Sequence, residues 1–264
     1  MSTGLLNGTM GFYLASSILY GIHWAFKKDF IQKIAFSILS LGFAIETLSI
    51  IERWREAQRP PFSNIYESLV FFSWAVVFVY LIFKAIFKID FLDFFVSISA
   101  LLILNYSSFF DKSVEPLIPA LRSNWLIFHV VVSFLGYAAF TLSFITSLLY
   151  FFKAKSKNPK RDPILLSLDE ISYQSVVFGF PFLSLGILSG AIWAEQAWGS
   201  YWAWDPKETW SLITWFIYAA YLHLRFVMGW REARAAFISI IGFLSVIFTY
   251  LGVTYFLPGL HSYA

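Results

Sequence analysis

The sequence predicts an all-α polytopic membrane protein with about eight transmembrane helices and a tryptophan-rich external loop. Three observations support this fold class. Of the 264 residues, 59% are hydrophobic and only 13% are charged, too few to cover a soluble domain of this length. Runs of about 20 apolar residues recur, and such a run can cross about 30 Å of hydrocarbon. Tryptophan is abundant, with 11 residues, and it is clustered.

Eight apolar runs are predicted to span the membrane. They lie at residues 8–26, 31–51, 65–87, 91–106, 125–152, 170–192, 209–228 and 235–256. Neither a linker nor a low-complexity segment divides them, so we expect a single integral membrane domain over residues 1–264. The first run lacks a basic region before it and a small-residue cleavage site after it. A cleavable secretory signal is therefore not expected.

Lysine and arginine residues predict the orientation, because cytoplasmic loops are enriched in them. The richer set of loops carries Lys27, Lys28, Lys33, Lys84, Lys88, Lys153, Lys155, Lys157, Lys160, Arg161, Arg225, Arg231 and Arg234. The poorer set carries Arg53, Arg55, Arg59, Lys112, Arg122 and Lys207. Both termini are then expected on the outer side, with the longer outer segments at 52–64, 107–124 and 193–208. This topology accounts for the net charge of +3, so no nucleic-acid partner is expected.

The tryptophan segment, residues 193–215, is the clearest candidate for a binding site. It contains Trp193, Trp198, Trp202, Trp204, Trp210 and Trp215. An interfacial aromatic belt is the simpler interpretation. A belt, however, spreads its tryptophans over many helix ends instead of gathering them in one loop. A dense aromatic shelf suits a large, flat, apolar ligand with polar edges.

The end of this segment predicts the start of a helix. Asp205 is expected to cap the seventh span, Pro206 fits the first helical position and Glu208 follows three residues after the cap. The free N–H groups and positive dipole of such a start attract anions. Lys207 adds a formal charge, so the propionates of a haem would fit there.

Two of the four histidines are predicted on the outer side with this segment. His129 lies one turn after Trp125, and His261 follows the helix-ending sequence Leu257-Pro258-Gly259. Neutral imidazoles ligate haem iron axially. Two outer histidines beside an aromatic shelf therefore fit a bis-histidine haem site, and two unrelated interfacial histidines are the alternative.

The other two histidines are predicted deeper in the membrane. His223 lies about 14 residues into the seventh span, roughly 21 Å below its outer end at 1.5 Å per residue. Arg225 follows at the expected cytoplasmic edge. An ionisable residue at such depth is a functional candidate. His23 lies at a similar depth near the inner end of the first span, and it either completes an inner haem site or simply reaches the interface.

Charged residues around the first outer segment allow two interpretations. Its three arginines are expected either to meet haem propionates or to face solvent and lipid headgroups, and two glutamates are candidates to pair with them. These residues are Arg53, Arg55, Arg59, Glu46 and Glu67. Ser63 and Asn64 are candidates to cap the third span.

Five stretches of the chain resemble the CcsA/ResC family of cytochrome c biogenesis, a tryptophan-rich haem-handling family of system II. They are Arg-Pro-Pro-Phe-Ser-Asn-Ile-Tyr-Glu-Ser-Leu (59–69), Pro-Ala-Leu-Arg-Ser-Asn-Trp-Leu-Ile-Phe-His (119–129), Trp-Gly-Ser-Tyr-Trp-Ala-Trp-Asp-Pro-Lys-Glu-Thr-Trp (198–210), Tyr-Leu-His-Leu-Arg (221–225) and Gly-Leu-His-Ser-Tyr (259–263). The third is the most specific. The resemblance covers most of the chain from about residue 55 onward, and the first 50 residues match less well.

The resemblance implies a cytochrome c assembly domain that handles haem b. It implies that His129 and His261 are the external axial ligands of the iron and that His223 is the transmembrane ligand. It implies that the shelf residues are Trp198, Trp202, Trp204, Asp205 and Trp210. It also implies a membrane partner of the CcsB/ResB type, on which the second transmembrane histidine is expected in place of His23.

The expected function is haem binding, delivery across the membrane and presentation for covalent attachment to apocytochrome c outside. The chain would then be part of a thioether-forming holocytochrome c synthase complex, although no catalytic residue of its own is assigned. The alternatives are a haem exporter without a role in attachment, a membrane haem electron carrier and a structural assembly subunit. The expected membrane is the bacterial inner membrane, with the thylakoid as the alternative.

Overall fold

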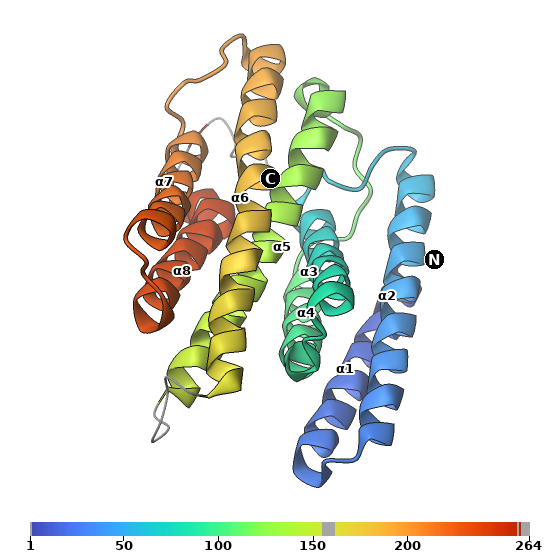
Figure 1. Ribbon diagram of the computed structural model, residues 1–264. Coiled ribbons are helices and arrows are strands. Elements are labelled where there is room, and N and C mark those ends of the chain that lie inside the picture. Colours follow the sequence, from blue (N-terminus) through green and yellow to red (C-terminus); the bar gives the residue numbers. More distant parts are fainter. Residues whose placement is uncertain (1, 155–161, 258, 260–264) are drawn as a thin grey trace. The chain divides into compact units, whose positions relative to one another are not determined.

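The structure is a computed structural model that describes residues 2–154, 162–257 and 259. Within these residues the regular elements are all helical (Figure 1). They are α1 (Ser2–Phe26), α2 (Asp29–Ala57), α3 (Ile65–Phe87), η1 (Asp90–Leu92), α4 (Asp93–Ser107), η2 (Pro119–Leu121), α5 (Asn124–Lys153), α6 (Pro163–Trp198), α7 (Pro206–Val227), α8 (Glu232–Ile247), the π-helix η4 (Phe248–Gly252) and α9 (Val253–Phe256). The chain divides into two compact units, Met1–Leu117 and Ile118–Ala264.

Each of the eight predicted spans coincides with a helix, which confirms the all-α polytopic fold class. Six of the described helical segments are long and apolar enough to cross a membrane: 29–57, 65–87, 90–107, 124–153, 163–198 and 232–256. The protein is therefore an integral membrane protein. Helices α1 and α7 are long enough, at about 37 Å and 33 Å, but their composition is more polar. The count of eight spans stays a prediction, as does the single domain over residues 1–264.

The first unit consists of α1 to α4. Helix α1 forms a hairpin with α2 and also packs against α4, and α3 packs against α4 and α2 (Figure 1). The buried face of α1 explains its polarity, because nearly all of its buried residues carry hydroxyl groups. These buried residues are Ser2, Leu6, Thr9, Tyr13, Ser16, Ser17 and Tyr20. The helix therefore turns hydroxyls inward and leaves apolar side chains such as Leu14 and Ile18 exposed.

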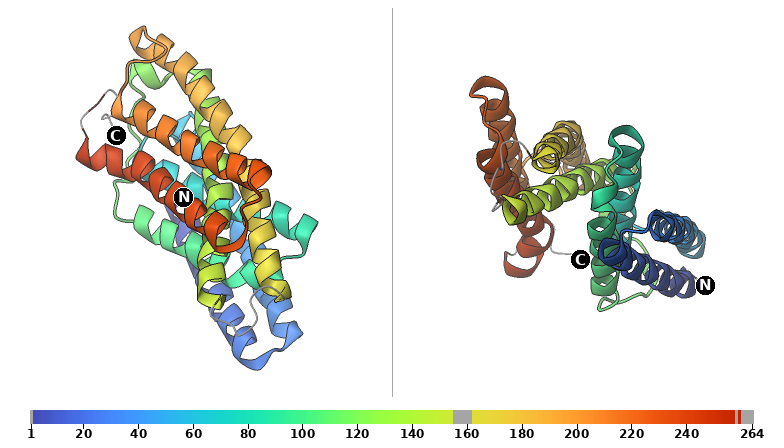
Figure 2. Two further views of the ribbon diagram at one scale, coloured as in Figure 1. Left: turned by 60° about the vertical axis from the view of Figure 1, so that its left-hand side comes forward. Right: turned by 60° about the horizontal axis from the view of Figure 1, so that its bottom comes forward.

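The second unit is built on the long pair α5 and α6, which lie side by side in both views (Figures 1 and 2). Helix α8 packs against α5 and α7. The core contains a stack of Phe140 on Tyr218, with ring centroids 3.7 Å apart. Two glycines permit this close approach, because a Cβ at Gly179 or at Gly242 would come within 2.8 Å of these rings. Glycine here serves helix contact, as small residues do between membrane helices.

Candidate functional site

The tryptophan segment runs from the end of α6 through a loop into α7, all within the second unit. Gly199 ends α6 in the left-handed conformation, with φ of 76°, which glycine adopts without steric cost. Trp204 also has a positive φ, 56°, a strained conformation for a bulky residue. Such strain persists only where the surrounding structure fixes it, and it gathers at functional sites.

The helix start predicted after this loop is confirmed. The Asp205 carboxylate accepts a hydrogen bond from the backbone N–H of Lys207 at 2.9 Å, and the Glu208 carboxylate accepts from the N–H groups of Asp205 and Ala203 at 3.1 Å and 2.8 Å. These contacts form a capping box with Pro206 in the first turn. Buried Asp205 and half-buried Glu208 thus accept from backbone N–H groups that the sequence analysis had expected to be open to an anion. Lys207, which is half-buried, remains the cationic group of this turn.

Three of the six tryptophans anchor the segment, and Trp198 meets the first of them, Trp193, edge to face with ring centroids 5.0 Å apart. Trp193 is buried and donates from Nε1 to the Ala120 carbonyl at 2.8 Å. Trp210 packs on Phe248, with centroids 4.3 Å apart, and Trp215 donates to Ser184 at 2.9 Å. These contacts hold the two ends of the segment to η2, to α6 and to the π-helix.

The loop rings face outward instead. Trp204 is 69% exposed and Tyr201 is 61% exposed. Trp202 is half-buried and meets Trp204 edge to face, with ring centroids 5.8 Å apart. This open aromatic surface, on a loop fixed at both ends, can receive a flat apolar ligand.

His129 lies against the same segment. Its Nδ1 is 2.7 Å from the Gly186 carbonyl oxygen, and its ring stacks on Trp193 with an interplanar angle of 16°. A carbonyl only accepts hydrogen bonds, so Nδ1 carries a proton, and Nε2 is the nitrogen through which this ring would ligate a metal. This is the arrangement by which metal-bound histidines are oriented. The imidazole of His129 is therefore set in the tautomer that ligates through Nε2.

The slot that receives His129 was not predicted from the sequence. A Cβ at Gly190 would come within 2.8 Å of Nδ1, so only glycine leaves room for the ring. Gly186 and Gly190 are four residues apart, the small-residue spacing that lets membrane helices approach closely. That spacing was a signal available in the sequence.

The end of the chain is described only in part. His261 lies outside the described residues, so its role stays a prediction. Gly259, two residues earlier in the sequence, lies beside the α7 start, where an added Cβ would clash with the Asp205 carboxylate and come 3.1 Å from Pro206.

His223 lies away from the tryptophan segment on α7. It is exposed, on a face that also carries the exposed side chains of Ile213, Phe216 and Val227. Thirteen residues separate it from Trp210, the last of the predicted shelf residues, which is about 20 Å along the helix. Arg225 is buried and pairs with Asp169 at 2.8 Å, so it belongs to the core of this unit.

His23 lies in the last turn of α1 in the first unit. Its Nδ1 lies 3.0 Å from the Lys28 carbonyl, so it donates to the backbone just after the helix. It also lines a cavity at this end of the unit.

The arginines of the first outer segment are engaged within the protein. Arg53 and Arg59 both pair with Glu67, at 3.0 Å and 2.9 Å, and all three are buried. Arg53 also donates to the carbonyls of Lys112 and Ser113, and Arg59 donates through Nη2 to that of Glu115. The predicted pairing with Glu67 is confirmed for these two arginines, and the alternative that they face solvent or headgroups is contradicted.

The other residues of this region differ from one another. Asn64 caps α3 by accepting from the Glu67 N–H at 2.8 Å, as predicted. Arg55 makes an exposed pair with Glu52. Pairing of Glu46 with an arginine is contradicted, because Glu46 accepts instead from the Tyr13 hydroxyl at 2.6 Å.

Fold and segment together define a class of protein: a helical integral membrane protein that carries a tryptophan-rich loop beside an oriented histidine. The family model described as cytochrome C assembly protein matches residues 62–261. The chain belongs to this family, and its function lies in cytochrome c assembly.

Individual relatives narrow the family further. The chain is 41% identical over 267 residues to the cytochrome c biogenesis protein CcsA of Chlamydomonas reinhardtii, covering 97% of this chain and 74% of the relative. It is 37% identical to CcsA of Mesostigma viride, covering 100% and 97%. It is 35% identical to CcsA of Prochlorococcus marinus, covering 97% and 92%. The chain therefore falls within the CcsA proteins, as its motifs predicted.

A solved structure shares the fold. The cytochrome c haem lyase CcmF superposes with a TM-score of 0.64 at 15% identity, covering 95% of this chain and 46% of the solved chain. The chain thus spans about half the length of that protein, and at this identity the likeness concerns the fold alone.

Proposed function

We propose that the chain binds haem b at the tryptophan segment and presents it for covalent attachment to apocytochrome c outside the membrane. The observation that carries the proposal is the orientation of His129. Its Nδ1 donates to the Gly186 carbonyl and its ring stacks on Trp193 of the segment, which leaves Nε2 as the ligating nitrogen.

The external site consists of two axial ligands and an aromatic surface. His129 and His261 ligate the iron, and the ring rests on the segment formed by Trp198, Trp202, Trp204, Asp205 and Trp210. Gly259, two residues before His261 in the sequence, lies beside Asp205 at the α7 start, and this supports the assignment of His261. Half-buried Lys207 is the cation available to a propionate.

A second site with His223 receives haem from the inner side. One imidazole supplies one of the two axial ligands, so the other comes from a CcsB/ResB-type partner that covers α7. The exposed apolar face with Ile213, Phe216 and Val227 suits such a partner within the membrane. His223 lies about 20 Å along α7 from Trp210. Two haem sites at different depths also favour a second candidate function, haem export without attachment.

Attachment itself needs positioning more than acid–base chemistry. Each thioether bond forms when a cysteine S–H of the apocytochrome adds across a haem vinyl group, sulfur to one carbon and hydrogen to the other. The addition needs no oxidant or reductant. The histidine of the apocytochrome then replaces one of the two axial imidazoles, and the product leaves. The bacterial inner membrane is the proposed site, with the thylakoid as the alternative.

Absorption spectra of the full-length protein, purified in detergent with its partner, test the proposal. We expect the split bands of low-spin bis-histidine haem in the wild type, and weaker or shifted bands in both His129→Ala and His261→Ala. His23→Ala is the matched control and should leave the spectrum unchanged. Absence of haem from the wild type would refute the proposal.

A second measurement separates presentation from export. Apocytochrome c co-expressed with the wild-type pair should acquire covalent haem, and with His129→Ala it should not. Transport of haem without covalent product would favour the export function.

A further inference from the structure

The first unit contains an acid buried within a predicted span. Glu46 lies near the middle of α2 and is fully buried, with a relative exposure of 0%. The Tyr13 hydroxyl donates to its Oε2 at 2.6 Å, and its Oε1 has no hydrogen-bond partner among the described residues. Gly42, one turn earlier, makes room for the Tyr13 ring, since a Cβ there would lie 2.8 Å from it. The fold thus delivers Tyr13 to this carboxyl.

The surroundings of Glu46 favour a neutral acid. The groups that face it are Tyr13 from α1 and Ser73 from α3. In the described part of the chain no lysine, arginine or histidine pairs with it, and Arg53 on the same helix is bound to Glu67. An uncompensated carboxylate in a low-dielectric interior is costly. A single carboxyl among hydroxyls suits a proton, because a metal ion would need more oxygen ligands.

Hydroxyl groups lead from Glu46 toward the end of the unit at which α1 terminates. Ser17 on α1, one turn after Tyr13, donates to Ser97 of α4 at 3.0 Å. Tyr20 lies one turn further, and its hydroxyl is buried without a partner in the described residues. These side chains follow the helical spacing of three to four residues that places neighbours about 5–6 Å apart.

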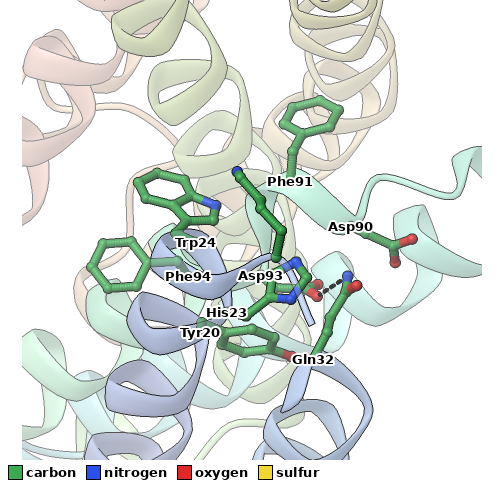
Figure 3. A pocket seen from close by; sticks show the side chains of 9 residues that line it. Tyr20, His23, Trp24, Gln32, Asp90, Phe91, Asp93 and Phe94 are labelled. Atoms are coloured by element: carbon green, nitrogen blue, oxygen red, sulfur yellow. Dashed lines mark hydrogen bonds between the residues drawn. The ribbon is translucent and has the colours of Figure 1, made fainter. Parts of the chain in front are cut away.

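This row ends in a cavity lined by both polar and aromatic side chains, drawn in Figure 3. The cavity has a volume of about 240 Å³ and is lined by Tyr20, Asp93, Gln32 and His23, among others. Gln32 donates to buried Asp93 at 3.4 Å, as the dashed line shows. Lys84 from α3 pairs with Asp93 and also, at 2.8 Å, with Asp90, which is largely exposed and forms the rim. A space of this size with polar groups on its wall has room for several waters.

A second row leads from Glu46 to the opposite end of the unit. Ser49 lies one turn after Glu46 on α2 and donates to the Ser2 carbonyl at 2.9 Å. The Ser2 hydroxyl donates to exposed Glu56 at 2.5 Å. From Ser2 to Tyr20 the hydroxyl face of α1 extends about 27 Å, close to the hydrocarbon thickness of about 30 Å.

We propose that the first unit conducts protons across the membrane along this hydroxyl path, with Glu46 as its central proton-binding group. Asp93 and Glu56 are the groups at its two ends. A proton enters at one end carboxyl, passes along hydroxyls and intervening waters to Glu46, and leaves at the other end, so no bond other than O–H forms or breaks. The path is independent of the haem ligands proposed in the second unit.

Proton flux into liposomes that contain the full-length protein and an enclosed pH-sensitive dye tests the proposal. A potassium diffusion potential should drive proton uptake into wild-type vesicles above that of protein-free vesicles. Glu46→Gln keeps the acceptor for Tyr13 but binds no proton, so uptake should fall to the protein-free level. Glu52→Gln, on the same helix but outside the path, is the matched control and should conduct like the wild type.

Infrared spectroscopy of the same variants guards against misfolding. The carbonyl band of a protonated carboxylic acid should be present in the wild type and in Glu52→Gln, shift in D₂O and vanish in Glu46→Gln, while the amide bands stay unchanged. Wild-type flux equal to that of protein-free vesicles would overturn the path even if the band is present. So would undiminished flux in Glu46→Gln.

Discussion

At the scale of single residues, two glycines of α6 decide what His129 can do. The Gly186 carbonyl fixes the proton on Nδ1, and Gly190 provides the space in which the ring lies. Neither residue offers a side chain to a ligand, yet both set the direction of Nε2. Imidazole ligands generally depend on such supporting contacts.

Gly190→Ala should therefore weaken haem binding almost as much as His129→Ala. The added Cβ would come within 2.8 Å of Nδ1 and must push the ring out of its slot. Loss of a contact that supports a metal ligand typically costs about 10–100-fold in affinity. Haem titration followed by absorption measures the change. Gly11→Ala in α1, where a Cβ meets nothing within 4 Å, is the control. Equal haem affinity in the wild type, Gly11→Ala and Gly190→Ala would contradict the role of the slot.

At the scale of elements, the start of α7 joins the loop to the rest of the second unit. The capping box fixes where the helix begins, and Trp210 one turn later packs on Phe248 of the π-helix. Thr214 continues this contact, since its hydroxyl lies 2.6 Å from Ser245 and 3.1 Å from Thr249. π-helical turns often mark functional sites, and this one faces the tryptophan segment.

Substitutions at Glu208 separate its capping role from its charge. Glu208→Gln retains an oxygen that accepts from the Asp205 and Ala203 N–H groups, so stability and haem binding should stay close to wild type. Glu208→Ala leaves these donors unpaired and should lower the free energy of unfolding by about 0.5–2 kcal/mol. The intrinsic tryptophan fluorescence during denaturation reports the difference. A large loss in Glu208→Gln would instead show that the negative charge itself is required.

At the scale of the whole molecule, topology decides whether the tryptophan segment faces the compartment of the apocytochrome. The charge distribution predicts that this segment lies outside and that the loop at 153–161 lies in the cytoplasm. Helices α1 and α7 are both needed for this arrangement, because the loss of either one as a span would place the termini on opposite sides.

Single cysteines test this topology directly, since the chain has no cysteine of its own. In intact cells a membrane-impermeant maleimide should label Tyr201→Cys, whose native side chain is 61% exposed. Ser156→Cys should react only after the membrane is opened. Labelling of Ser156→Cys alone in intact cells would show the opposite orientation. Labelling of both variants in intact cells would refute the predicted topology.

Much of the protein followed from the sequence alone. Apolar runs located every main helix, because crossing a bilayer demands about 20 apolar residues whatever the neighbouring helices are. The helix start at Asp205, Pro206 and Glu208 and the helix cap at Asn64 could also be predicted from the sequence, because capping depends on residues only a few positions apart. The tryptophan motif indicated cytochrome c assembly, which the family comparison confirms.

Only the tertiary structure decided which side chains meet across helices. In the structure Arg53 and Arg59 pair with Glu67. Glu46 accepts a hydrogen bond from Tyr13, and the Gly186 carbonyl accepts one from His129. These partners lie from 8 to 57 positions apart in the chain. Local propensity carries no information about such pairs, because the rotation and register of packed helices select them. The sequence determined the spans and the motif, whereas the packing of the helices determined the tautomer of the histidine and the hydroxyl path around Glu46.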